Sequence, residues 1–322
     1  MNSLGRIFRV SIFGESHGPC IGMVIDGVPP GIEFSEADML QDLARRKPSL
    51  PGTTARHEAD APRILSGVYH GRTTGAPLAC VIENSDARGA DYSKLAEHPR
   101  PSHGDFASRI KYRASNDTRG GGHLSGRLTA PLVAAGALAK KIITPAFIRA
   151  VILDEESVRR RAEEAALARD SVGAILEVRV GEMPAGLGEP WFDSVESLLA
   201  HALFSVPGIK GIEFGAGFAA AAMTGSKYND KLLDKSGKTA SNNDGGITGG
   251  ISNGNELVFR VAAKPTPSIG LEQETYSFGE GKVTPLVIQG RHDACFALRL
   301  PPVLEAVSAI VLADLALFEK TL

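Results

Sequence analysis

The sequence predicts a globular protein of mixed helices and strands, built as one large domain or as two intimately joined halves. With 322 residues, the chain is long enough to bury a large core. Its 43% hydrophobic and 22% charged residues are ordinary for a folded protein and argue against disorder. A strand, a proline–glycine turn and a helix follow one another in each half. These patterns alone fit both an open α/β sheet and a layered α+β fold.

The first half contains alternating strand and helix patterns. Ser35 is a good N-cap, and the helix after it carries acids in its first turn and bases in its last, which favours the helix dipole. This helix places Arg45, Arg46 and Lys47 at its C-terminal end. The polar, glycine-rich stretch 84–126 is long enough to suggest a functional loop. We expect strands at about 8–13, 20–26, 64–70 and 78–83 and helices at 35–46 and 128–143.

The second half partly repeats this order, which predicts two pseudo-equivalent halves of about 1–150 and 170–322. A charged helix at about 155–169 joins them, and a polar insertion covers 226–243. We expect strands at about 173–182, 209–214, 256–263 and 285–289, a helix at 193–205, and a C-terminal helix opened by Pro301 and Pro302.

Charge and cysteine content narrow the class of protein. A formal net charge of −2 gives no global basic field for nucleic acid or an anionic membrane. The three cysteines, Cys20, Cys80 and Cys295, have no spacing typical of zinc or a disulfide framework, so we expect no metal and a reducing cytoplasm. No apolar signal core precedes the first strand, and Glu305 and Asp314 interrupt the apolar C-terminal run.

Two segments resemble nucleotide-binding motifs, but both motifs are incomplete. Ser236–Thr239 resembles the end of a phosphate-binding loop, but Leu232 occupies the position of its first glycine. Gly215–Ala220 loosely resembles a dinucleotide fingerprint, yet no crossover helix and no acid complete the pattern. A flexible loop and an ordinary turn are the better interpretations.

Polar, glycine-rich loops hold most of the candidate chemistry. Gly14-Glu-Ser-His-Gly18 places an acid, a hydroxyl and an imidazole between two glycines. Singly, each arginine could be a surface ion pair and each histidine a solvated loop residue. Together these loops provide arginine forks, backbone N–H groups and titratable imidazoles, which suit a multiply anionic ligand. The other loops of this kind are 100–105, 119–127, 242–254, 264–268 and 291–293.

Four of these segments carry a specific resemblance over nearly the whole chain. Gly14–Gly18, continuing to Pro30, is similar to the N-terminal signature of the chorismate synthase family. Gly122–Arg127 resembles its middle signature, and Arg291–Cys295, continuing through Glu305–Val307, its C-terminal one. The stretch from Asn253 to Ile269 is also similar to that family.

The resemblance implies a lyase of the shikimate pathway, in aromatic amino acid biosynthesis. It would form chorismate and inorganic phosphate from 5-enolpyruvylshikimate 3-phosphate by anti-1,4-elimination, with reduced FMN lending electron density and recovering it. By resemblance, His17 is the acid near the departing phosphate, His103 protonates or stabilises the reduced flavin, and Asp293 assists flavin N5 in taking the C6 proton. Imidazoles and a carboxylate are chemically suited to these tasks.

The resemblance also implies binding residues. The substrate carries two carboxylates and a phosphate, for which the candidates are Ser16, Arg45, Arg46, Arg119 and Arg127. Ser125 is a further hydroxyl donor. The implied flavin contacts are His123, Leu124, Ser125, Pro207, Gly208, Gly249, Lys264, Pro265, Thr266, Pro267, Ser268 and Arg291.

The implied fold is α+β, with a helical layer between two antiparallel sheets, and the implied assembly is a homotetramer. Departures from the family pattern are Leu128 where Glu is common, His123 where some members have Arg, and the loop 48–53, which lacks an arginine linked to nicotinamide binding. NADPH would then act only indirectly, through a separate flavin reductase. Two alternatives remain: a flavin- or phosphosugar-binding protein without turnover, and an NAD(P)H-dependent flavin reductase.

Overall fold

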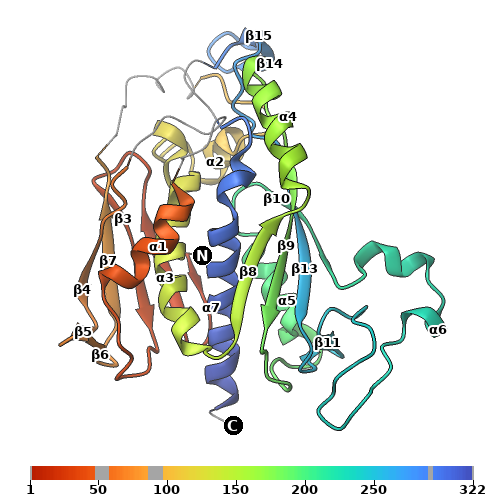
Figure 1. Cartoon of the computed structure of the whole chain (residues 1–322). Coiled ribbons are helices and arrows are strands. Elements are labelled where there is room, and N and C mark those ends of the chain that lie inside the picture. Colours follow the sequence, from red (N-terminus) through yellow and green to blue (C-terminus); the bar gives the residue numbers. More distant parts are fainter. Residues whose placement is uncertain (1, 48–57, 86–96, 289–292, 321–322) are drawn as a thin grey trace.

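Two antiparallel sheets enclose a layer of helices in the computed structural model, which describes residues 2–47, 58–85, 97–288 and 293–320 (Figure 1). The first half contains β1 (Ser3–Leu4), β2 (Arg9–Gly14), β3 (Cys20–Asp26), α1 (Glu36–Arg46), β4 (Pro62–Ser66), β5 (Val68–Tyr69), β6 (Arg72–Thr73), β7 (Leu78–Glu83), α2 (Asp105–Lys111) and α3 (Thr129–Ile142). The second half contains β8 (Phe147–Ile152), α4 (Glu155–Leu167), β9 (Ala174–Gly181), α5 (Val195–Leu203), β10 (Ile209–Phe214), α6 (Gly225–Tyr228), β11 (Ile247–Thr248), β12 (Ile251–Ser252), β13 (Leu257–Ala263), β14 (Gln273–Ser277), β15 (Lys282–Leu286) and α7 (Pro301–Glu319).

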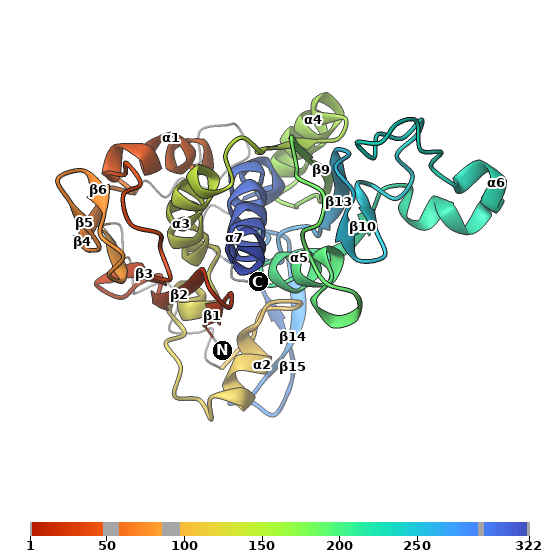
Figure 2. The same cartoon turned by 90° about the horizontal axis from the view of Figure 1, so that it is seen from below.

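The sheets come from opposite halves of the chain. One has the strand order β1-β2-β3-β7-β4 and the other β10-β13-β9-β8, and their neighbouring strands pair antiparallel. Helices α1, α3 and α7 lie between them in both views (Figure 2). The expected α+β layering is therefore confirmed, and the open α/β sheet is excluded. That the two halves are pseudo-equivalent stays a prediction.

Helix α7 is the centre of the core. Its residues are apolar on nearly all sides, the pattern of a helix surrounded by protein. Among the described residues it is the one helix long and apolar enough to cross a membrane, although Glu305 and Asp314 lie in it, and 78% of that apolar window is buried. Asp314 accepts the backbone N–H groups of Arg6, Ile7 and Phe8 at 2.7–3.0 Å. We conclude that α7 is a core helix that also anchors the N-terminal segment.

A close crossing of α3 and α7 depends on small residues. A Cβ at Gly136 would lie 2.3 Å from the Cβ of Ala306 on α7. Alanines fill much of the buried face of α3, so the helix backbones can approach closely. This contact holds the middle of α3 against the first half of α7.

Most expected elements lie within a few residues of the observed ones. Three longer elements, β8, α2 and β14, were not predicted, nor were the short elements β1, β6, α6, β11 and β12. Gly67, with φ +86°, divides the strand expected at 64–70 into β4 and β5. The strand expected at 285–289 overlaps only the end of β15. Strands β14 and β15 form a separate polar hairpin without an alternating apolar face, so hydrophobic periodicity gave no clear signal for them.

Candidate active site

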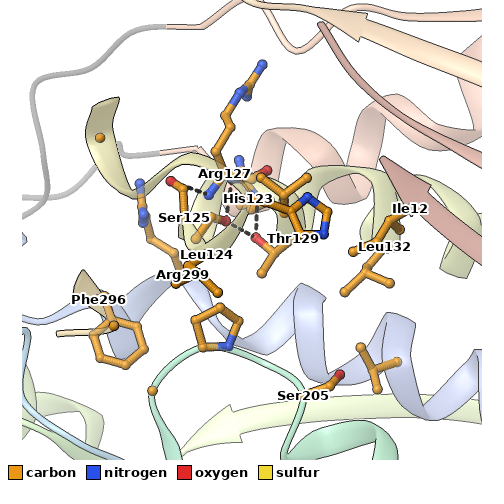
Figure 3. Close-up of a pocket in the computed structure, with 18 of the residues that line it drawn as sticks. Ile12, His123, Leu124, Ser125, Arg127, Thr129, Leu132, Ser205, Phe296 and Arg299 are labelled. Atoms are coloured by element: carbon orange, nitrogen blue, oxygen red, sulfur yellow. Dashed lines mark hydrogen bonds between the residues drawn. The ribbon is translucent and has the colours of Figure 1, made fainter. Parts of the chain in front are cut away.

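Segments far apart in the sequence surround a cavity of about 750 Å³. Small-molecule and cofactor sites typically enclose about 300–1,000 Å³. Figure 3 shows Leu124, Ser125 and Arg127 on one wall, Phe296 and Arg299 on another, and Ile12 with Leu132 on a third. Further lining residues come from the end of α1 and from residues 58–60, 102–104, 201–208 and 264–268. The cavity therefore has a cationic side and an apolar side.

His17 lies in this wall, buried against a run of glycines. Its Nδ1 is 2.8 Å from Ser16 Oγ, and its exposed fraction is 9%. A Cβ at Gly120 would lie 2.2 Å from His17 Cε1, and Gly120 has φ +57°, so only glycine fits there without strain. Ser16 N–H also donates to the Gly122 carbonyl at 3.1 Å. The N-terminal pentapeptide and the triple-glycine turn thus shape one surface.

His103 lies in the wall beside an acid and an arginine. Its Nδ1 is 2.7 Å from Asp105 Oδ1, and Arg100 donates to both Asp105 oxygens at 2.7 and 2.8 Å. Burial would raise the pKa of Asp105, but hydrogen bonds from Arg100 and His103 outweigh it and hold that pKa well below its usual range. Asp105 is therefore an ionised acceptor next to the imidazole.

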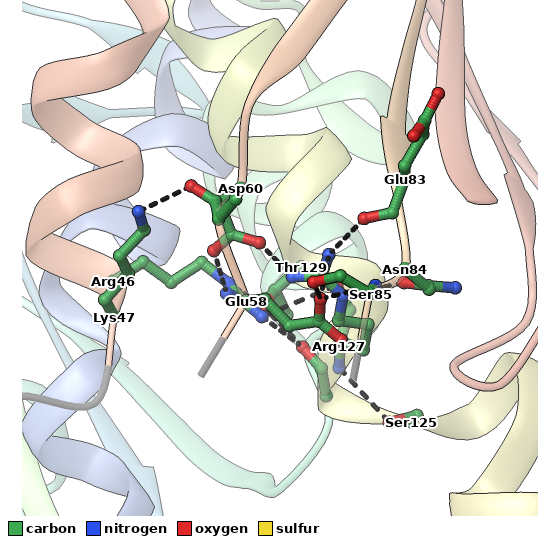
Figure 4. Close-up of polar contacts among 12 residues, drawn as sticks. Arg46, Lys47, Glu58, Asp60, Glu83, Asn84, Ser85, Ser125, Arg127 and Thr129 are labelled. Carbon is green, nitrogen blue, oxygen red and sulfur yellow. Dashed lines mark hydrogen bonds and ion pairs between the residues drawn. The ribbon is translucent and has the colours of Figure 1, made fainter. Parts of the chain in front are cut away.

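A cluster of charged side chains forms the cationic side of the cavity, with Asp60 and Arg127 at its centre (Figure 4). Arg46 donates to Thr129 Oγ1 at 2.9 Å and pairs with Asp60 at 3.3 Å. Arg127 also pairs with Asp60 and donates to Asn84 Oδ1 at 3.1 Å. Asp60 thus holds two guanidinium groups side by side, which suits recognition of a phosphate or carboxylate.

The pKa of Arg46 reflects both its burial and the charges around it. Burial and the positive charges of Arg299 and Arg127 together lower the pKa of Arg46 to about 9, against the opposing effect of Asp60 and Asp293. Three guanidinium groups are thus close enough to repel one another. A bound anion would relieve that repulsion.

Arg299 is a cavity residue that the sequence analysis missed. It pairs with Asp293 at 3.1 Å, and its Nε is buried without a hydrogen-bond partner among the described residues. The signal was present, because Arg299 stands two residues before the helix-opening Pro301 and six residues after Asp293. An acceptor placed in the cavity would satisfy this nitrogen.

Most of the expected flavin contacts line the cavity. Those that do are His123, Leu124, Ser125, Pro207, Gly208, Lys264, Thr266, Pro267 and Ser268. Pro265 and Gly249 are not among the lining residues, and Gly249 lies in the turn between β11 and β12. Arg291 falls outside the described residues.

The expected substrate ligands divide into two groups. Arg46 and Arg127 line the cavity. Ser16, Arg45 and Arg119 are described but are not among its lining residues: Ser16 lies behind His17, and Arg119 is half exposed and pairs with Asp117 at 2.8 Å. Arg45 turns into the helical layer, where it donates to both oxygens of Glu305 at 2.6 and 2.7 Å.

Comparison with known proteins identifies the family. A family model described as chorismate synthase matches residues 8–154 and 151–317. The chain belongs to the chorismate synthase family. The expected enzyme class, a carbon–oxygen lyase acting on a phosphate in the shikimate pathway, is thereby confirmed.

Individual relatives extend the match over the full chain. A chorismate synthase from Chitinophaga pinensis is 56% identical and covers 99% of this chain and 98% of its own length. A chorismate synthase from Pyrococcus abyssi is 44% identical and covers 98% of each chain. A crystal structure of a chorismate synthase superimposes with a TM-score of 0.74 at 27% identity, covering 98% of this chain and 93% of that one.

Proposed function

We propose that this chain converts 5-enolpyruvylshikimate 3-phosphate into chorismate and inorganic phosphate in the cavity described above, with reduced FMN as its cofactor. The observation that carries the proposal is the convergence of His17, His103 and Asp293 on one cavity beside a cluster of arginines. These three residues stand up to 276 positions apart in the sequence, yet all three line the same cavity. In the reaction the C3–O bond to phosphate breaks, the C6 proton leaves, and a new double bond forms.

The cavity fits a flavin together with an anionic substrate. Its apolar side, formed by residues such as Val10, Ile12 and Leu132, suits an aromatic ring system. Two buried polar atoms that line it, Thr266 Oγ1 and Arg299 Nε, have no hydrogen-bond partner among the described residues. When bound, reduced FMN supplies transient electron density to the substrate as phosphate departs.

The protein residues bind, orient and move protons. Arg46, Arg127 and Arg299 hold the phosphate and carboxylates by charge-assisted hydrogen bonds, and Arg119 is proposed at the rim. His17 donates a proton to the leaving phosphate, and Asp293 supplies a carboxylate that assists removal of the C6 proton. His103, which lines the cavity, would hold a proton and stabilise the reduced cofactor when it is bound. Lys264, Ser268 and the backbone around Ser125 are proposed to bind the cofactor.

Assembly and cellular context are part of the same proposal. Trp191 and Phe192 are 85% and 90% exposed, a degree of aromatic exposure that suits burial in the proposed homotetramer. We propose a cytoplasmic enzyme that receives reduced flavin from a separate NADPH-dependent reductase, because the loop 48–53 lacks the arginine linked to nicotinamide binding.

An anaerobic assay with chemically reduced FMN tests this function. Equal amounts of chorismate and phosphate should form, and no product should appear with oxidised FMN. Binding of FMN and substrate without phosphate release would favour a binding protein instead. Oxidation of NADPH in the absence of substrate would favour a flavin reductase.

A further inference from the structure

The carboxylate of Asp105, two residues after His103, contacts the His103 ring. Asp105 Oδ1 lies 2.7 Å from His103 Nδ1 and also accepts from Arg100 Nη2, while Arg100 Nε donates to Asp105 Oδ2. The backbone N–H of Arg100 also donates to Asp105 at 3.0 Å. The Asp105 and Arg100 side chains are only 15% and 6% exposed, so water screens their interactions little.

These contacts determine which nitrogen of His103 carries the proton. An ionised carboxylate only accepts hydrogen bonds, so an Nδ1 that lies 2.7 Å from it must be protonated. Arg100 Nη2 is also 3.1 Å from this Nδ1. A guanidinium can only donate a hydrogen bond, so a bond from Arg100 would require an unprotonated Nδ1 with a lone pair, which is the other tautomer. The shorter contact, to the anion, decides between them. Nε2 then carries the lone pair of the neutral ring.

His103 meets Asp105 and Arg100 through Nδ1, and Nε2 lies on the opposite edge of the ring, beside Gly121. A Cβ at Gly121 would lie 3.4 Å from His103 Cε1 and 3.7 Å from Nε2, so the glycine leaves this edge without a side chain above it. His103 and the neighbouring Gly104 both line the cavity. A ligand in the cavity would therefore meet Nε2.

The loop that carries the expected flavin contacts braces this arrangement. Arg100 Nη1 donates to Ser268 Oγ at 3.3 Å, and Lys264 Nζ donates to the Ser102 carbonyl at 2.7 Å. Lys264 is the charged group that faces the His103 loop from this neighbouring segment. Ligand contacts at 264–268 and the orientation of His103 are therefore mechanically linked.

We propose that Asp105 is a positioning residue that holds neutral His103 as the Nδ1–H tautomer with Nε2 toward the cavity, and that Arg100 fixes Asp105 and offsets its charge. This inference deepens the proposed function and rests on it for the nature of the ligand that meets Nε2. In this arrangement the Nδ1–H faces Asp105, and Nε2 is the ring nitrogen that can exchange a proton with a ligand.

The tautomer can be measured directly by long-range ¹H–¹⁵N NMR on the full chain without ligand, labelled at histidine. The eight histidines can be distinguished by the signal lost in His103→Gln. Neutral His103 should show the Nδ1–H pattern in the wild type and in Asp105→Glu, and the Nε2–H pattern in Asp105→Ala. Asp42→Ala is the matched control, because Asp42 is 14% exposed and paired with cations but lies in a different cluster.

Two results would overturn the proposal: an Nε2–H pattern in the wild type, or an unchanged Nδ1–H pattern in a folded Asp105→Ala protein. Anaerobic turnover provides an independent readout. Asp105→Ala should lower kcat about 10- to 100-fold with little change in KM, since positioned proton transfer contributes at least about 100-fold. If the wild type makes no chorismate, the proposed function is wrong. The NMR measurement still tests the tautomer of His103, because it requires neither ligand nor turnover.

Discussion

Arg45 and Arg46 are adjacent on α1, yet they belong to clusters with opposite properties. Arg45 joins a helix-layer cluster of Asp42, Arg45, Lys140 and Glu305. There a hydrogen bond to Glu305 raises the pKa of Arg45 above its ordinary value despite partial burial. Arg46 joins the cavity cluster of Arg46, Asp60 and Arg127, where burial and neighbouring guanidinium groups lower its pKa.

The difference lies in access to the cavity. In the helix-layer cluster two acids face two bases, and Glu305 also accepts the Ala150 N–H at 3.2 Å. The cluster is internally satisfied and joins α1, α3 and α7. In the cavity cluster Arg46, Arg127 and Arg299 pair with Asp60, Glu58 and Asp293, and all six residues line an open volume. The same residue types therefore serve stability in one place and anion binding in the other.

The largest expected effect is on proton transfer at the cavity. His17→Ala and His103→Ala should each reduce kcat by about 100-fold or more, because each removes a positioned acid. Anaerobic phosphate release measures the loss, and His70→Ala, at an exposed turn, is the control. Near-normal rates in both cavity variants would remove these histidines from the mechanism.

A second pair of variants separates the two clusters directly. Arg127→Ala should raise KM for the anionic substrate about 10- to 100-fold, since hydrogen bonds to charged groups contribute about 1.5–3 kcal/mol. Arg45→Ala should leave KM unchanged and lower the free energy of unfolding by about 1 kcal/mol, because its side chain is 41% exposed and Lys140 still pairs with Glu305. Steady-state kinetics and urea unfolding give both values. A raised KM in Arg45→Ala would contradict the division.

The smallest effect on activity is expected at Glu305. Burial would raise the pKa of Glu305, but hydrogen bonds and charge from Arg45 and Lys140 hold it below the ordinary 4.5. A lowered folded-state pKa means that these contacts stabilise the protein above about pH 4.5 and are lost as the pH falls through the lowered pKa. Glu305→Gln should therefore destabilise the protein by about 1–3 kcal/mol at pH 7 and much less at acidic pH.

Urea unfolding of wild type and Glu305→Gln between pH 7 and pH 3 measures this difference. Turnover per folded molecule should be the same in both proteins at pH 7. An equal loss of stability at every pH would show that Glu305 acts through packing and not through its charge.

Local patterns predicted much of the fold. The capped helix that begins after Ser35 is observed, with Asp38 accepting the Ser35 N–H at 2.8 Å. The polar strand β14 and the short helix α2 escaped prediction because neither has an apolar stripe long enough to mark its period. The glycine-rich motifs located the site, since sharp turns and close backbone contact require glycine at positions such as 120.

By itself the sequence determined most of the longer helices and strands, the loops that carry the chemistry, and the family resemblance, because these depend on residues near one another in the chain. The tertiary structure decided what each charged side chain does. Arg45 meets Glu305 across 260 positions, and Arg46 meets Thr129 across 83. Successive side chains on a helix point in different directions, so neighbours in sequence reach different surroundings. Only the packed fold supplies those surroundings, and with them the access to the cavity that separates a structural arginine from a binding one.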